Sequence, residues 1–289
     1  KGNMVKLIPA ELLGEDALAN QTASGEPYYY SYTLKGDGVE EWEPRFTYYG
    51  FRYVQVEGAA PAAENNKGDK PVVEELKLLH TRSSLPVVGS FECSNPLFNN
   101  IFQLINWAMK SNLASVTTDC PHREKLGWLE VTHLVGSSIK YNYDILNYYD
   151  KIIEDMRNGQ MPEGLVPDYV PEFNTSDGGF RDSPEWGSSS VIVPWYVYKW
   201  YGDKEPLMKS YDMMKRYVAY LGSKDKDHIL SYGLGDWFDL GPARPGPSQL
   251  TPMALTATSI YFYDVDILSK VAGVLGKKED AWNYAVLAK

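Results

Sequence analysis

The pattern of apolar and polar positions divides the chain into a first part with a period of about two residues and a longer part with a period of about 3.6. Strand-like runs lie at 26–34, 47–56 and 72–82, with a short helix as the alternative for the last run. In the first run Tyr28, Tyr30 and Tyr32 alternate with other residues, which is typical of a half-buried strand. Turn formers and charges fill the separator at 59–70. Residues 1–88 therefore predict an antiparallel β-sandwich whose N-terminal portion lies outside the sequence.

From about residue 89 the period becomes helical. Asn95 and Pro96 are typical of a helix cap and of a first helical position, so the first helix is expected to begin there. A second helix is expected from near Pro121 to about Met156, with Asn158-Gly159 ending it. Further helices are expected at 185–201, 206–221, 252–275 and from 278 onward. Such antiparallel helix pairs predict about half of an (α/α)6 toroid.

Two long irregular segments, 161–184 and 233–248, interrupt the helices and are rich in proline and glycine. Loops of this length are often functional. The last helix runs to Lys289 without a Gly, Asn or Pro that would end it. We therefore expect an internal fragment of a longer protein, in which residues 89–289 form the truncated N-terminal part of the helical domain.

The composition narrows the classes of partner. The net charge of -10 over 289 residues disfavours nucleic acid and anionic membranes, because phosphate groups need a basic surface. The 22 tyrosines and 8 tryptophans are rings that carbohydrate clefts use, although large cores use them too. Cys93 and Cys120 are too few to form a disulfide framework. The first residues lack a signal-peptide pattern, but a segment cut from an exported protein fits, so a periplasmic or secreted location is favoured.

The densest group of reactive side chains lies in residues 117–130. Its carboxylates Asp119, Glu124 and Glu130 could supply general acid chemistry if burial or a neighbouring charge kept one of them protonated. The alternative is structural: Asp119 would cap a helix, and the other two would make solvated ion pairs. His122 has no second histidine at metal-binding spacing, so no metal site is expected.

Two later segments repeat the pairing of carboxylates with tryptophan. They are 181–187, which contains Trp186, and 235–239, which contains Asp236 and Trp237. Placed at the same end of successive helical pairs, these segments would converge on one cleft. Core packing is the alternative for each tryptophan. No phosphate loop, dinucleotide fingerprint or nucleophile elbow is present, so glycoside hydrolysis by paired carboxylates is the most economical chemistry.

The run from Asp119 to Trp128, DCPHREKLGW, resembles the D-C-P-x-R-x-x-x-G-W signature of bacterial α-L-rhamnosidases of glycoside hydrolase family 78. Segment 42–53 resembles the part of the family's sandwich domain that precedes the catalytic domain. Shorter motifs fall in family order at 185–187, 201–203 and 235–237. Together these matches cover most of residues 42–289.

The resemblance implies β-sandwich domains around an (α/α)6 catalytic toroid that releases terminal L-rhamnose with inversion and without a cofactor. It casts Glu124 as the general acid and Asp119 and Arg123 as sugar-binding residues. Further sugar contacts are implied for Trp128, Glu130, Trp186, Asp236 and Trp237. In the family the general base comes from a later part of the toroid, so we expect it beyond residue 289 and expect the chain alone to be inactive.

One departure from the family concerns Glu130. Many members follow Gly-Trp with Thr-Gly-Asp, whose Asp contacts substrate, whereas Leu129, Glu130 and Val131 follow here. The longer side chain of Glu130 permits it to take that role from the neighbouring position. The change bears on sugar or linkage preference rather than on the class of reaction.

The expected partner is a rhamnose-containing oligosaccharide or glycoside. Exposed apolar faces of a half toroid predict self-association, for example as a homodimer. Two alternatives stay open at this point. One is a carbohydrate-binding relative that has lost the chemistry, and the other is a glucoamylase-like hydrolase or a lyase on the same toroid.

Overall fold

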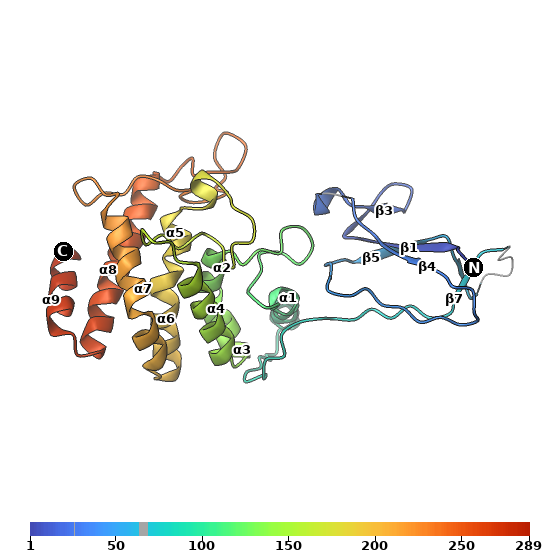
Figure 1. Cartoon of the computed structure of the whole chain (residues 1–289), viewed down its shortest axis with the longest axis horizontal. Coiled ribbons are helices and arrows are strands. Elements are labelled where there is room, and N and C mark those ends of the chain that lie inside the picture. The colour runs from blue at the N-terminus through green and yellow to red at the C-terminus, as the bar shows by residue number, and fades with distance from the viewer. Residues whose placement is uncertain (26, 64–68) are drawn as a thin grey trace. The chain divides into compact units, whose positions relative to one another are not determined.

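The structure is a computed structural model that describes residues 1–25, 27–63 and 69–289 (Figure 1). The chain forms two compact units. The β unit comprises residues 1–83 and 104–125, and the helical unit comprises residues 84–103 and 126–289. Neither unit is one continuous stretch of sequence. The boundary expected after residue 88 between two sequence domains stays a prediction.

The β unit holds the strands of the described residues. They are β1 (Met4–Ala10), β2 (Leu12–Leu13), β3 (Ala19–Asn20), β4 (Tyr30–Thr33), β5 (Tyr53–Glu57), β6 (Ala60–Pro61) and β7 (Val72–Val73). A three-stranded antiparallel sheet has the order β4-β1-β5, and Leu7 on the central strand pairs with Tyr30 on one side and Val56 on the other. β2 pairs antiparallel with β3, whereas β6 pairs parallel with β7. The expected antiparallel pairing therefore fails for the last pair.

The first two predicted strands are shorter in the structure. The tyrosine-rich run becomes β4, while residue 26 lies outside the described residues. The run at 47–56 becomes a strand only from Tyr53. Its earlier part turns away from the sheet, since the Gly50 N–H donates to the Pro121 carbonyl at 2.7 Å instead of to a neighbouring strand.

The strand predicted at 72–82 is wrong beyond the two residues of β7. Leu76, Leu78 and Leu79 are 45%, 65% and 69% exposed, so the apolar pattern there has no sheet to pack against. A strand needs a hydrogen-bonding neighbour, and the described residues offer none to this segment. Of the separator predicted at 59–70, residues 64–68 lie outside the described residues.

The helices follow the sequence signals more closely. They are α1 (Pro96–Asn112), α2 (Leu129–Leu134), α3 (Gly136–Asn142), α4 (Leu146–Gly159), α5 (Pro184–Gly187), α6 (Ser189–Tyr201), α7 (Glu205–Gly222), α8 (Met253–Val274) and α9 (Lys278–Leu287), with short 3₁₀ turns at Thr22–Ser24 and Gly178–Phe180. The start at Pro96 is confirmed, with the Asn95 side chain accepting the Leu97 N–H at 3.0 Å. The ends at Gly159 and at Gly202, whose φ is 74°, are confirmed too.

The single helix predicted from Pro121 to Met156 is wrong. Lys125 has a left-handed φ of 56° and Trp128 is extended with ψ 122°, so no helix can run through this segment, and α2 begins at Leu129. Asp119 is therefore not a helix cap. A second break falls at Tyr143, which is extended (φ -133°, ψ 148°) between α3 and α4. Three short helices replace one long one.

Helix α6 forms the centre of the helical unit, where it packs against α4, α7 and α8 (Figure 1). Val191, Ile192 and Val193 are consecutive and almost fully buried. A helix with apolar residues on all sides, rather than along one stripe, has to be surrounded by other elements. The apolar sequence of α6 therefore predicts its central place.

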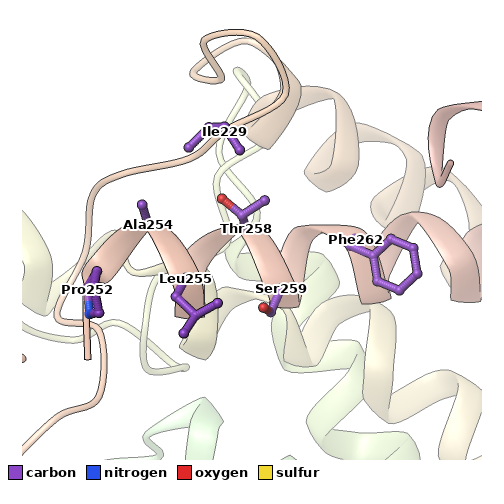
Figure 2. A pocket seen from close by; sticks show the side chains of 7 residues that line it. All are labelled: Ile229, Pro252, Ala254, Leu255, Thr258, Ser259 and Phe262. Carbon is purple, nitrogen blue, oxygen red and sulfur yellow. The ribbon is translucent and has the colours of Figure 1, made fainter. Parts of the chain in front are cut away.

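Other apolar side chains stay exposed. Helix α1 has no buried residue, and an apolar pocket lies at the N-terminal half of α8, with Pro252, Leu255 and Phe262 among its lining (Figure 2). Self-association through such faces stays a prediction. Within the described residues, no helix combines the length and the apolar character that crossing a bilayer requires.

The junction of α5 and α7 leaves no room for a side chain at Gly187. A Cβ there would lie 2.7 Å from Cζ of Tyr217, a ring that is 1% exposed and cannot move aside. Gly187→Ala should therefore lower the free energy of unfolding by about 1–3 kcal/mol through overpacking. In the control Gly273→Ala, a Cβ on α8 would meet nothing within 4 Å, and helix propensity should raise that free energy by up to about 1 kcal/mol. Urea unfolding measures both. Equal stability of the two variants would contradict the close packing of Gly187 against Tyr217.

Candidate active site

The β unit carries the first group of predicted site residues, on the turn formed by residues 119–125. The Pro121 carbonyl accepts the Gly50 N–H at 2.7 Å, and Lys125 Nζ donates to the Tyr48 carbonyl at 2.8 Å. Both ends of the turn are thereby tied to residues 48–50, which lie between β4 and β5 in the sequence. The turn is thus folded onto the β unit rather than onto a helix.

The acidic and basic groups of this turn lie close together. Arg123 Nη2 lies 3.3 Å from Glu124 Oε1, and the Cys120 sulfur accepts the Glu124 N–H at 3.3 Å. The Glu124 side chain is 37% exposed, and Asp119 is half-buried on the same turn. His122 faces Glu11, with 3.5 Å between Nε2 and Oε2. The turn therefore presents Glu124 and Arg123 at the surface of the β unit.

The helical unit carries the second group, beginning at the start of α2. Trp128 packs edge-on against Tyr169, with ring centroids 5.0 Å apart. The Leu129 N–H donates to the Asp168 carbonyl at 2.8 Å, and the Ser189 hydroxyl donates to the Leu129 carbonyl at 2.6 Å. These bonds fix the first turn of α2, and so fix the backbone of Glu130.

A second set of hydrogen bonds joins the start of α5 to the same place. Asp168 Oδ1 accepts the Ser183 N–H at 2.9 Å, and the Ser183 hydroxyl accepts the Leu234 N–H at 2.9 Å. His133 Nε2 faces the Glu185 carbonyl at 2.9 Å and therefore donates to it. Three loops far apart in the sequence are thus held against one another, and each carries a carboxylate close to Glu130.

Asp236 and Trp237 lie on the third of these loops. The Thr251 hydroxyl donates to Asp236 Oδ2 at 3.0 Å, and Trp237 packs edge-on against Phe180 with centroids 5.3 Å apart. Asp239 holds the loop by accepting two backbone N–H groups, and these bonds hold the pKa of its carboxyl below its ordinary value. Asp236 is exposed and Trp237 partly so, which leaves both available to a ligand.

The carboxyl groups near Glu130 have raised pKa values. Burial raises the pKa of Glu130 to about 7, and the nearby charges of Glu185 and Asp236 add to the effect. Burial likewise raises the pKa of Glu185, and raises that of Asp168 to about 9. Among the described residues, none of these four groups takes part in an ion pair. Asp168 therefore keeps its proton at neutral pH, and Glu130 loses its proton only as the pH rises through about 7.

Glu185 and Asp168 are the members of this cluster that the sequence did not single out. Glu185 is 8% exposed and neither of its carboxyl oxygens has a hydrogen-bond partner, since the nearby Thr256 hydroxyl donates to the Met253 carbonyl. Asp168 is fully buried. The proximity of Glu185 to Trp186 was a signal in the sequence, whereas nothing local marks Asp168.

Trp186 lies differently from the other two predicted tryptophans. It is 4% exposed, so it offers almost no surface on which a sugar ring could stack. Its place in a sugar-binding wall stays a prediction, and its burial favours the alternative of core packing. Trp128 and Trp237 are only half-buried. Within the described ranges, no cluster of three or more His, Cys, Asp and Glu side chains is suited to hold a metal ion.

Comparison with known proteins gives the family. Residues 86–289 match the model of the bacterial alpha-L-rhamnosidase 6 hairpin glycosidase domain, and residues 1–74 match that of the bacterial alpha-L-rhamnosidase concanavalin-like domain. An alpha-L-rhamnosidase of Formosa agariphila is 33% identical over 92% of the chain, and one of Streptomyces avermitilis is 32% identical over 99%. The chain spans only 29% and 26% of these two relatives.

Solved structures agree with the sequence comparison. The alpha-L-rhamnosidase from Dictyoglumus thermophilum superposes with a TM-score of 0.85 at 36% identity, over 99% of this chain and 31% of that one. The Streptomyces avermitilis alpha-L-rhamnosidase complexed with L-rhamnose gives a TM-score of 0.81 at 30% identity, over 99% of this chain and 26% of that one. With a helical six-hairpin glycosidase domain that follows a small sheet region, the chain belongs to the bacterial α-L-rhamnosidase family.

Proposed function

We propose that the full-length product of this gene hydrolyses α-L-rhamnosides and releases the terminal non-reducing sugar. Family membership supports the proposal, and so does the L-rhamnose named in the Streptomyces avermitilis complex. The observation in the structure that carries it is the group of carboxyls around Glu130, whose pKa burial raises to about 7, together with the half-buried Trp128 and Trp237. Neutral carboxyl groups both donate and accept hydrogen bonds, as sugar hydroxyls require, and indole rings suit the apolar face of a sugar.

In the proposed reaction, Glu124 donates a proton to the glycosidic oxygen while the bond from that oxygen to the anomeric carbon breaks. Water attacks the anomeric carbon from the opposite face, and a second carboxylate takes the proton of that water, so that the configuration inverts. Inverting pairs of carboxyl groups lie about 6.5–9.5 Å apart to leave room for the water. We place this general base outside residues 1–289, since the chain spans less than a third of the two curated relatives.

The remaining predicted residues bind the sugar in this proposal. Asp119 and Arg123 belong to the turn that carries the acid. Trp128 and Trp237 offer partly exposed rings, while Glu130 and Asp236 offer carboxyl oxygens to hydroxyl groups. The finer architecture that we propose is about half of an (α/α)6 toroid for the helical residues, preceded by part of a β-sandwich.

A second assignment of the general acid has a specific observation in its favour. Glu130 keeps its proton up to a pH of about 7, as a general acid near neutral pH must. It lies six positions after Glu124 in the sequence. The two assignments differ in which carboxyl group loses its proton to the leaving group, so they can be separated by substitution.

The proposed function is tested with the full-length gene product on a panel of aryl glycosides. We expect turnover of aryl α-L-rhamnosides and little of the matched glucosides, galactosides and uronides. Proton NMR of the first sugar released should show the β-anomer, as inversion requires. A preference for another sugar, cleavage by elimination, or initial release of the α-anomer would overturn the corresponding part of the proposal.

Substitution identifies the acid. Two substrates are compared, a 4-nitrophenyl and an alkyl α-L-rhamnoside. Glu124→Gln should lower kcat for the alkyl substrate by about 100-fold or more, because an alkoxide leaves poorly without a proton. The good nitrophenolate leaving group needs less help, so its loss should be smaller. The matched variant Glu130→Gln should instead raise KM for both substrates. The reverse pattern would transfer the role of acid to Glu130.

Stability should depend on pH through Glu130. Its pKa rises from an ordinary 4.5 to about 7 on folding. Below pH 4.5 both states carry the proton, and as the pH rises from 4.5 to 7 the unfolded chain ionises first, so the free energy of unfolding falls. Glu130→Gln has no such term. The free energy of unfolding of Glu130→Gln, relative to that of the wild type, should therefore rise by up to about 3 kcal/mol between pH 4 and pH 8.

Urea unfolding at both pH values measures this difference. The control is Glu74→Gln, at an exposed position. The difference between its free energy of unfolding and that of the wild type should be the same at both pH values. A constant difference between Glu130→Gln and the wild type would mean that Glu130 ionises in the folded protein with its ordinary pKa.

A further inference from the structure

We infer that Lys125 is a positioning residue for the proposed acid Glu124, and that it acts through an aromatic clamp on the β unit. The inference rests on the proposed function, since it gives a role to the neighbour of the acid. Lys125 Nζ lies 3.8 Å from the ring centroid of Tyr49 and 5.1 Å from that of Tyr48, and it donates to the Tyr48 carbonyl at 2.8 Å. The ammonium group is therefore enclosed by two rings and a carbonyl dipole.

The backbone of Lys125 adopts an unfavourable conformation. Its φ of 56° lies in the left-handed region, which is less favourable than the right-handed one for a residue with a Cβ. Glycine would adopt the same conformation without strain. A lysine at this position is explained by its side chain, whose cation–π contact and hydrogen bond offset the strain.

The clamp is rigid because its ring is itself held. Tyr49 stacks on Tyr28 with centroids 3.8 Å apart and an interplanar angle of 14°, and it also packs against Tyr30 on β4. Within the described residues, no carboxylate forms an ion pair with Lys125. Burial lowers the pKa of its ammonium group, as expected for a cation that faces rings rather than water. The lysine thus anchors the turn and does not neutralise the acid.

The other end of the turn is fixed as tightly. A Cβ on Gly50 would lie 2.6 Å from Cγ of Pro121, so the two backbones can approach only because residue 50 is glycine. The Gly50 N–H then bonds to the Pro121 carbonyl at 2.7 Å. Glu124 lies between the two anchors, at Pro121 and Lys125, and its position is set by the β unit.

The clamp predicts a specific kinetic defect. A displaced acid protonates the leaving oxygen less well, and this matters only when the leaving group needs the proton. In the full-length gene product, Lys125→Met should lower kcat for an alkyl α-L-rhamnoside by about 10–100-fold, with KM little changed. For the 4-nitrophenyl rhamnoside the loss should stay below about 3-fold. A residue with a merely structural role would lower both rates equally.

Variants on the ring side keep the test independent of the lysine. Tyr49→Leu removes the π face and should reproduce the defect of Lys125→Met, whereas Tyr49→Phe keeps the face and should restore wild-type kinetics. Lys140→Met is the matched control, because Lys140 lies 5.6 Å from the ring of Tyr141 on α3, which belongs to the helical unit. It should leave both rates unchanged.

The outcomes separate the inference from the function on which it rests. No turnover of any rhamnoside by the wild type overturns the proposed function, and the clamp with it. Wild-type turnover with an equal loss on both substrates in Lys125→Met and Tyr49→Leu, or with no loss, overturns the clamp alone. If Lys125→Met does not fold, the comparison of Tyr49→Leu with Tyr49→Phe decides, and identical kinetics of these two variants would refute the inference.

Discussion

The candidate site of the helical unit depends on the hydrogen bonds of one buried residue, Asp168. Its carbonyl accepts the N–H at the start of α2, its N–H donates to the Arg181 carbonyl, and its carboxyl oxygen accepts the Ser183 N–H at the start of α5. Three segments that are remote in the sequence therefore meet at one point. Since α2 carries Glu130 and α5 carries Glu185, the same bonds set the distance between those two carboxyl groups.

That convergence has an electrostatic consequence. Burial raises the pKa values of Glu130, Asp168 and Glu185, and nearby like charges add to the rise for Glu130 and Asp168, since no cation of the described residues forms an ion pair with these groups. Loss of hydration is an energetic cost in the free protein. Raised pKa values of this kind gather at functional sites, which agrees with the place of Glu130 among the candidate residues.

The turn that bears Glu124 depends on a different part of the chain. It is tied to the tyrosine-rich β unit by Lys125 and by the close approach of Gly50 to Pro121. In sequence order the turn follows α1 and precedes α2, yet it packs with the strands. The β unit therefore sets the position of Glu124 on this turn.

The sequence by itself determined the local features: the cap and start of α1, the glycines at the ends of α4 and α6, and the DCPHREKLGW block that gives the family. Each depends on residues within a few positions of one another. The break after Pro121 was missed because a left-handed residue such as Lys125 is held by rings some 76 positions earlier in the chain. Only the tertiary structure decided the burial of Trp186, the hydrogen bonds that join three segments at Asp168, and the raised pKa of Glu130. The reason is that desolvation and like charge come from neighbours that are brought together by folding and not by sequence spacing.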